Sequence, residues 1–258
     1  MITSFKEILV YRENLFVWVV IDIMTFAIFP FVILSTFGDR ETLDGYTRQM
    51  IITYYVLIPL ISSVTVSYVW DNAGHDVREG TIAQYVTKPL SYVNFLFWSE
   101  SGIKILRLIL ILPLVLAILP FVHTYIHIPD LSAVSLVSFV VIIMFGTAIG
   151  FLTASILGAF SCWTTRADWV LQAWWIISTF AAGYVAPITL YPLWLQKSIS
   201  YLPFSLMVDV PIRTLLGTIT TPEIISAGTK GLVWIAVLFG INKILWHQGL
   251  KRVDVVGI

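Results

Sequence analysis

The sequence predicts an all-α integral membrane protein with six transmembrane helices, an N-terminal amphipathic helix at the membrane interface, and a broken re-entrant hairpin on the outer side between the fifth and sixth helices. Of the 258 residues, 58% are hydrophobic and only 12% are charged, whereas a soluble domain carries charge on roughly a quarter of its residues. The apolar residues form long uninterrupted segments, without the alternation typical of outer-membrane barrels. We therefore expect a single transmembrane domain over residues 1–258.

Six segments are long enough to be membrane spans. A helix needs about 20 mostly apolar residues to cross a hydrocarbon core about 30 Å thick. Backbone amides in lipid find no water to bond, so the spans are expected to be helical. The six segments are residues 15–37, 50–70, 99–121, 132–158, 169–188 and 229–247.

The positions of lysine and arginine predict the orientation. With six spans both termini lie on one side, and that side carries an excess of positive residues such as Arg78, Lys251 and Arg252. Because positively charged loops stay in the cytoplasm, both termini are expected to be cytoplasmic. The formal net charge of +0 gives no indication of a nucleic acid partner.

The N-terminal part of the chain contains two features of interest. Residues 1–13 combine apolar and charged residues at helical spacing, so we expect an amphipathic helix at the membrane interface; the alternative is a water-exposed extension of the first span. Asp22 lies inside that span, where a carboxylate costs about 3 kcal/mol. It either belongs to a transport path, or it is paired or snorkels to the interface.

The segment after the second span is rich in charge. Residues 71–92 are expected to form a cytoplasmic loop that is polar from Asp71 to Gly80. Residues 81–87 then indicate a short helix, which ends at Lys88 and Pro89. A solvated loop would explain the charges alone, whereas a docking surface for a cytoplasmic partner would explain the short helix as well.

The stretch from about 190 to 216 is too apolar for an ordinary outer loop, and prolines interrupt it at Pro192, Pro203 and Pro211. We expect one or two short helices that dip back into the membrane, where surrounding protein shields the broken backbone. The alternative is an interfacial helix that lies flat.

Two further patterns concern packing. Small residues recur at every fourth position, namely Gly146, Gly150, Ala154 and Gly158. This spacing lets another helix approach closely, either within the subunit or across a dimer.

Aromatic residues such as Tyr54 and Trp174 lie within spans. They either line a path for amphipathic substrates or pack in the core.

Motifs of catalysis are absent from the sequence. No Gly-x-x-x-x-Gly-Lys-Ser/Thr phosphate loop, Gly-x-Ser-x-Gly elbow or His-Glu-x-x-His pair occurs. His123 and His127 share a helical spacing, but a third metal ligand is missing and an interfacial position explains them. We expect no enzyme activity from this chain alone, and no metal or cofactor bound to it.

Several segments together resemble the export permeases of the ABC-2 type. The first follows the second span and reads Arg78-Glu79-Gly80-Thr81-Ile82-Ala83-Gln84-Tyr85-Val86-Thr87-Lys88-Pro89-Leu90-Ser91. The second comprises Tyr191-Pro192-Leu193-Trp194, then Tyr201-Leu202-Pro203-Phe204, continued by Pro211-Ile212-Arg213 and Gly217. The ending Gly249-Leu250-Lys251-Arg252-Val253 is also similar. Together with the six-span layout, the resemblance covers essentially the whole chain.

The resemblance implies a permease that pairs with a second permease, identical or paralogous, and binds two copies of an ABC ATPase that carries ATP and magnesium. It implies alternating access, in which the loop after the second span couples to the ATPase and the outer hairpin closes the pathway. ATPase coupling would then fall to Asp71, Asp76, Arg78, Glu79, Thr81 and Gln84. The translocation path or dimer seam would include Trp18, Asp22, Tyr54, Trp174 and Tyr184. The outer hairpin would include Tyr191, Pro192, Pro203 and Phe204.

Two other functions remain open at this point. An ATP-independent secondary transporter or channel is the main alternative, and it would be expected to carry more ionisable groups within the membrane than Asp22. A membrane enzyme would need a clustered catalytic set, which the sequence lacks. The expected location is a prokaryotic plasma membrane, the cell inner membrane.

Overall fold

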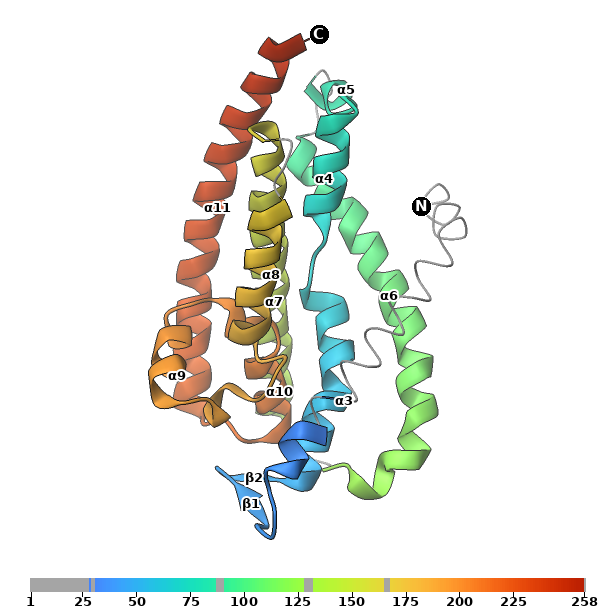
Figure 1. The fold of residues 1–258 in the computed structure, drawn as a ribbon, viewed down its shortest axis with the longest axis vertical. Coiled ribbons are helices and arrows are strands. Elements are labelled where there is room, and N and C mark those ends of the chain that lie inside the picture. Colours follow the sequence, from blue (N-terminus) through green and yellow to red (C-terminus); the bar gives the residue numbers. More distant parts are fainter. Residues whose placement is uncertain (1–27, 29–30, 87–90, 128–131, 165–167, 258) are drawn as a thin grey trace.

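The computed structural model describes residues 28, 31–86, 91–127, 132–164 and 168–257. Within this part the chain is predominantly helical (Figure 1). The α-helices are α3 (Arg48–Thr65), α4 (Val69–Arg78), α5 (Ala83–Val86), α6 (Tyr92–Val122), α7 (Ala133–Ala159), α8 (Asp168–Ala182), α9 (Leu193–Ser200), α10 (Asp209–Leu216) and α11 (Thr221–Gly257). The short 3₁₀ helices are η1 (His123–Tyr125), η2 (Phe160–Cys162), η3 (Ile188–Leu190) and η4 (Phe204–Met207).

Three stretches of the described residues are long and apolar enough to cross a membrane: Arg48–Arg78, Ala133–Cys162 and Thr221–Arg252. They cover the predicted second, fourth and sixth spans. Helix α6 has 31 residues and covers the third. The six-span layout itself stays a prediction, because most of the first span, the N-terminal amphipathic helix, Trp18 and Asp22 lie outside the described residues.

The predicted fifth span, 169–188, is wrong at its C-terminal end. Helix α8 ends at Ala182 and has 15 residues, about 22 Å at 1.5 Å per residue. Gly183 follows with a φ of 91°, a conformation that suits glycine and ends helices. The sequence pattern missed this end because the residues after it remain apolar.

The prediction of a polar loop from Asp71 to Gly80 is wrong, because residues 69–78 form helix α4. Its first turn carries Asp71 and its last turn Arg78, each favourable for the helix dipole. Val69 and Ala73 are buried on its inner face. The polar composition thus belongs to an amphipathic helix. The short helix predicted at 81–87 is present as α5, although residues 87–90 lie outside the described part.

The predicted span 50–70 is interrupted. Helix α3 ends at Thr65, Val66 is extended, and the next helix begins only at Val69. At this break the carbonyl oxygen of Thr65 packs against Gly150 of α7 so closely that a Cβ there would clash with it.

Helix α7 is the centre of the packing, with α3, α4, α10, α11 and η4 around it. The small-residue face predicted from the sequence lies here and packs within the subunit. Gly146 adjoins the backbone of Leu206, and a Cβ on Gly158 would lie 2.8 Å from that of Ala73. Close approach of backbones is what small residues on membrane helices permit.

The stretch predicted as an outer hairpin does form short helices, namely η3, α9, η4 and α10. In Figure 1 they lie alongside α7 and α11, away from the end of the molecule where α11 finishes. At the opposite end, β1 (Thr42–Leu43) and β2 (Tyr46–Thr47) form an antiparallel hairpin whose turn contains Asp44 and Gly45 at positive φ. This small hairpin was not predicted and is an exception to the all-α class.

Candidate functional site

Helix α4, the turn after it and α5 form one structural unit, residues 69–86, which we call the α4–α5 element. It lies at the end of the molecule where α11 also ends (Figure 1). Asp71, Arg78, Glu79 and Gln84 of the predicted coupling set are exposed. Arg78 and Glu79 form no ion pair with any residue that the structure describes. The element therefore presents an accessible surface of mixed charge.

Asp76 and Thr81, also in the predicted coupling set, have a different position. Both are half-buried. One carboxylate oxygen of Asp76 accepts a 2.9 Å hydrogen bond from the Thr81 hydroxyl, and the other accepts a 2.7 Å bond from the Tyr92 hydroxyl. The Asp76 carbonyl also accepts from the backbone N–H of Ile82 at 3.1 Å. Asp76 thus holds the turn in shape and ties it to the start of α6.

Tyr92 continues this connection into the helix bundle. Its ring lies 5.1 Å from that of Trp246 on α11, and the indole N–H of Trp246 donates a 2.9 Å hydrogen bond to Ser155 on α7. Burial, together with the hydrogen bond to Asp76, raises the pKa of Tyr92 above its ordinary value, so the phenol keeps its proton at neutral pH. The α4–α5 element is consequently linked to α6, α7 and α11 through fixed contacts.

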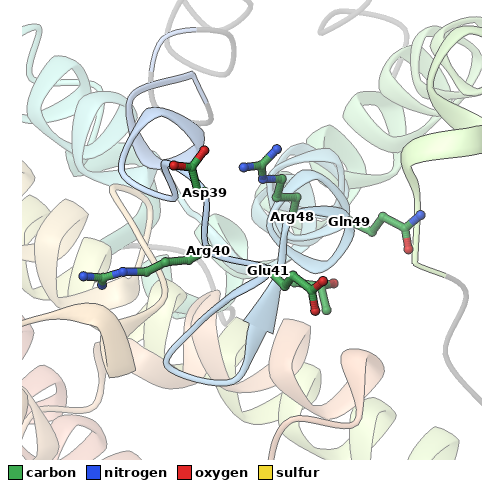
Figure 2. A pocket seen from close by; sticks show the side chains of 6 residues that line it. Asp39, Arg40, Glu41, Arg48 and Gln49 are labelled. Atoms are coloured by element: carbon green, nitrogen blue, oxygen red, sulfur yellow. The ribbon is translucent and has the colours of Figure 1, made fainter.

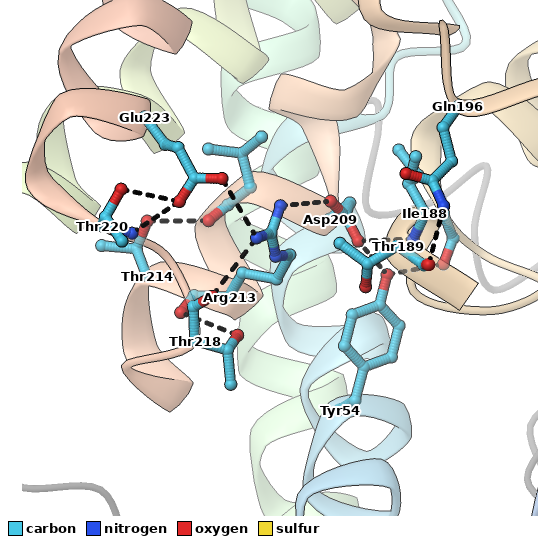
Figure 3. A network of polar contacts seen from close by, with 12 residues as sticks. Tyr54, Ile188, Thr189, Gln196, Asp209, Arg213, Thr214, Thr218, Thr220 and Glu223 are labelled. Atoms are coloured by element: carbon cyan, nitrogen blue, oxygen red, sulfur yellow. Dashed lines mark hydrogen bonds and ion pairs between the residues drawn. The ribbon is translucent and has the colours of Figure 1, made fainter. Parts of the chain in front are cut away.

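A second polar arrangement lies in the interior, and Figure 3 shows it. Asp209 of α10 is only 1% exposed. It accepts a 3.0 Å hydrogen bond from the Ile188 N–H, lies 3.3 Å from the Tyr54 hydroxyl, and pairs with Arg213 at 3.8 Å. Arg213 also lies 3.9 Å from Glu223 of α11. A buried carboxylate needs such partners, and these partners come from three separate parts of the chain.

Of the residues predicted for the path and the hairpin, Trp18 and Asp22 lie outside the described part of the chain, and the others are placed as follows. Tyr54 is fully buried, so it would line a path only after the surrounding helices separate. Trp174 of α8 is half-buried, and its ring meets that of Phe204 edge to face with 4.8 Å between the ring centroids. Tyr184 is half-buried.

The predicted hairpin residues differ in exposure. The Tyr191 hydroxyl donates to the Phe180 carbonyl at 3.2 Å. Pro192 is exposed at the N-terminus of α9, and Pro203 is buried before η4.

Sequence inspection missed three buried charged residues. Glu100 and Lys104 of α6 are 2% and 8% exposed, and Asp209 is the third. Glu100 lies 3.7 Å from Arg107, whose guanidinium covers the Tyr68 ring at 4.6 Å. The signal available in the sequence was the spacing of opposite charges by four residues, Glu100 with Lys104 and Asp209 with Arg213, within apolar surroundings.

An open cleft of about 390 Å³ lies beside the β-hairpin. Figure 2 shows that its side chains point in different directions. They belong to Asp39, Arg40, Glu41, Thr47, Arg48 and Gln49. Among the described residues, no group of three His, Cys, Asp or Glu side chains is placed to hold a metal ion.

Long apolar helices packed through small residues, with a charged element at one end, define a helical membrane-embedded protein. Residues 16–257 match the model of a protein family described as ABC-2 family transporter protein, and the chain belongs to this family. It is therefore a permease component of an ABC-type transporter, a transport component that is not itself catalytic. Permeases of this family generally work with ABC ATPase subunits. No curated protein and no solved structure matches the chain.

Proposed function

We propose that this chain is the transmembrane permease subunit of an ATP-driven exporter in a prokaryotic plasma membrane. Two such permeases, identical or paralogous, bind two copies of a separate ATPase, which holds the ATP and magnesium. The α4–α5 element docks on the ATPase, both termini are cytoplasmic, and alternating access moves an amphipathic substrate outward. Six spans and a re-entrant outer hairpin complete this arrangement.

The observation that carries the proposal is the anchoring of the α4–α5 element. Its charged surface is accessible, while Asp76 and Tyr92 tie it to helices that run the length of the bundle. A solvated surface helix would not require such an anchor. An anchor suits a docking element, because packed side chains and hydrogen bonds carry a movement of the ATPase to the helices of the pathway.

The hairpin part of the proposal is supported by burial. Asp209, Pro211 and Ile212 of α10 are buried against the bundle, and α10 lies alongside α3 and α7 (Figure 1). Interrupted backbone at membrane depth is tolerated where protein surrounds it. The Asp209 contacts to Tyr54 and Ile188 then close the outer end of the pathway.

The buried carboxylates Glu100 and Asp209 are the observation that favours the alternative, an ATP-independent secondary transporter or channel. Each carboxylate, however, lies within 4 Å of an arginine, Arg107 and Arg213 respectively. Such pairs are common in structural roles, whereas ion-coupling groups must be able to exchange their partner. The ATP-driven function therefore remains the better supported one.

Reversal of two charges tests the proposal. The double variant Arg78→Glu with Glu79→Arg is reconstituted in lipid nanodiscs with the ABC ATPase that co-purifies with the unmodified permease. We expect permease-dependent ATP hydrolysis to fall by about tenfold or more, because opposed charges at a docking surface cost several kcal/mol. Unchanged hydrolysis would contradict the docking role.

The chain offers a matched control. Arg40 and Glu41 form the same dipeptide, are exposed, and lie beside the β-hairpin at the opposite end of the molecule. Arg40→Glu with Glu41→Arg should leave ATP hydrolysis at the level of the unmodified permease. An equal loss in both double variants would indicate a general effect of charge reversal and would also contradict the proposal.

A further inference from the structure

A groove of about 260 Å³ lies between the end of α9 and α11, apart from the α4–α5 element and from the Asp209 contacts. It is lined by Ser200, Tyr201, Thr229, Lys230, Val233 and Trp234. The indole N–H of Trp234 donates a 3.0 Å hydrogen bond to the Tyr201 carbonyl, which joins the two walls and orients the indole ring.

Lys230 is the charged group of this groove. It is exposed and lies roughly two and a half turns beyond Thr221, within the stretch Thr221–Arg252 that is apolar enough to cross a membrane. Its ammonium group donates to the Ser200 carbonyl at 3.5 Å, a long contact. No carboxylate of the described residues lies within 4.0 Å of it. An ammonium group next to lipid is unfavourable without an anion beside it.

The other groups of the groove indicate what anion would fit. Thr229 and Ser200 already donate their hydroxyl protons to backbone carbonyls, at 2.9 Å and 2.7 Å, so they do not donate to a ligand. Tyr201 is 77% exposed, and its hydroxyl has no hydrogen-bond partner among the described residues. The donors for an anion are therefore Lys230 and Tyr201. Val233, 59% exposed, and the Trp234 ring form an apolar wall beside them.

We propose that this groove binds one anionic glycerophospholipid. The lipid phosphate contacts the Lys230 ammonium group and the Tyr201 hydroxyl, and an acyl chain lies along Val233 and Trp234. A free phosphate would leave the apolar wall unused, which is why the ligand is a lipid. The bound lipid bridges α9 and α11 and holds the short helices of residues 190–216 against the last helix.

Native mass spectrometry of the full chain in detergent, titrated with dioleoylphosphatidylglycerol, tests this proposal. We expect a first lipid-binding step that dioleoylphosphatidylcholine does not reproduce. Lys230→Gln should weaken this step about fivefold, the effect of one cation near an anionic lipid surface. Lys230→Arg should retain it, and Tyr201→Phe should weaken it by a smaller factor.

Lys197→Gln is the matched control, because Lys197 is an exposed cation of α9 that does not line the groove. The Lys197→Gln variant should bind dioleoylphosphatidylglycerol with the same affinity as the unmodified chain. Equal affinity of Lys230→Gln and the unmodified chain would overturn the proposal and leave Lys230 as a lysine that extends to the interface. An equal loss in Lys197→Gln would overturn it as a general charge effect. Displacement of the lipid by glycerol 3-phosphate alone, at the same concentration, would overturn the lipid assignment.

Discussion

Tyr54 and Asp209 lie 155 residues apart in the sequence and meet in the interior, where the Tyr54 hydroxyl lies 3.3 Å from an Asp209 carboxylate oxygen. The same hydroxyl donates to the Gly183 carbonyl at 2.7 Å. Because Asp209 also accepts from the Ile188 N–H and pairs with Arg213, this contact joins α3, the segment after α8, and α10.

Loss of the Asp209 carboxylate should destabilise the fold. Asp209→Ala removes the buried carboxylate that pairs with Arg213 and accepts from the Ile188 N–H, and removal of one member of a buried ion pair costs about 3–5 kcal/mol. Asp209→Asn keeps an acceptor oxygen and should cost less. In thermal unfolding in detergent, the unmodified chain should therefore have the highest midpoint, Asp209→Asn a lower one and Asp209→Ala the lowest. Asp39→Ala, which removes an exposed carboxylate, should shift the midpoint little; a Tm for Asp209→Ala equal to this control would refute the structural role.

A methyl group at Gly150 should disrupt the packing of α7. The added Cβ would clash with the Thr65 carbonyl oxygen, and because that neighbour is backbone, a shift of the helix break is required, at a cost of about 1–3 kcal/mol. Gly240→Ala on α11 is the control, because a Cβ there meets no atom within 4 Å and a helical alanine is favoured over glycine by up to about 1 kcal/mol. The Tm should fall for Gly150→Ala and should stay the same or rise for Gly240→Ala. The opposite order would show that the break at residues 66–68 packs elsewhere.

Removal of the Tyr92 hydroxyl should loosen the α4–α5 element without unfolding the chain. Tyr92→Phe keeps the ring contact with Trp246 but loses the hydrogen bond to Asp76, a loss of about 1 kcal/mol. We expect faster hydrogen exchange at the backbone amides of residues 81–85, measured by mass spectrometry in nanodiscs. Tyr125→Phe, at an exposed tyrosine far along the chain, should leave that exchange unchanged. Identical protection in the Tyr92→Phe chain would mean that Asp76 does not need this partner.

Cysteine labelling should place the two ends of the molecule on opposite sides of the membrane. The background is Cys162→Ala, since Cys162 is the single cysteine of the chain. In intact cells a membrane-impermeant maleimide should label Glu41→Cys, whereas Glu79→Cys should react only after lysis, because the excess of positive charge predicts a cytoplasmic α4–α5 element. Labelling of Glu79→Cys from outside would reverse the orientation and remove the docking role.

Composition was sufficient to predict α7 and the middle of α11, residues 229–247, because long apolar runs in a chain so poor in charge have few alternatives to a membrane helix. Helix α11 extends beyond the predicted span at both ends, from Thr221 to Gly257. The four-residue spacing of Gly146, Gly150 and Gly158 correctly predicted a close approach. It did not identify the partners, Leu206, Thr65 and Ala73, because small residues permit contact with any backbone of suitable shape. Helix α4 was mistaken for a loop because its polar face outweighs the few buried residues that pack on α7.

Hydrophobicity and local motifs act over short stretches of chain, so the residues alone were enough to predict a helical membrane protein that resembles the ABC-2 family. The folded arrangement was needed to see that Asp76 anchors to Tyr92, that Asp209 is buried with Tyr54 and Arg213, and that Lys230 lines a groove without a carboxylate. The physical reason is that the cost of burying a charge depends on which distant groups surround it. Those neighbours are brought together by packing and do not follow from the residues on either side.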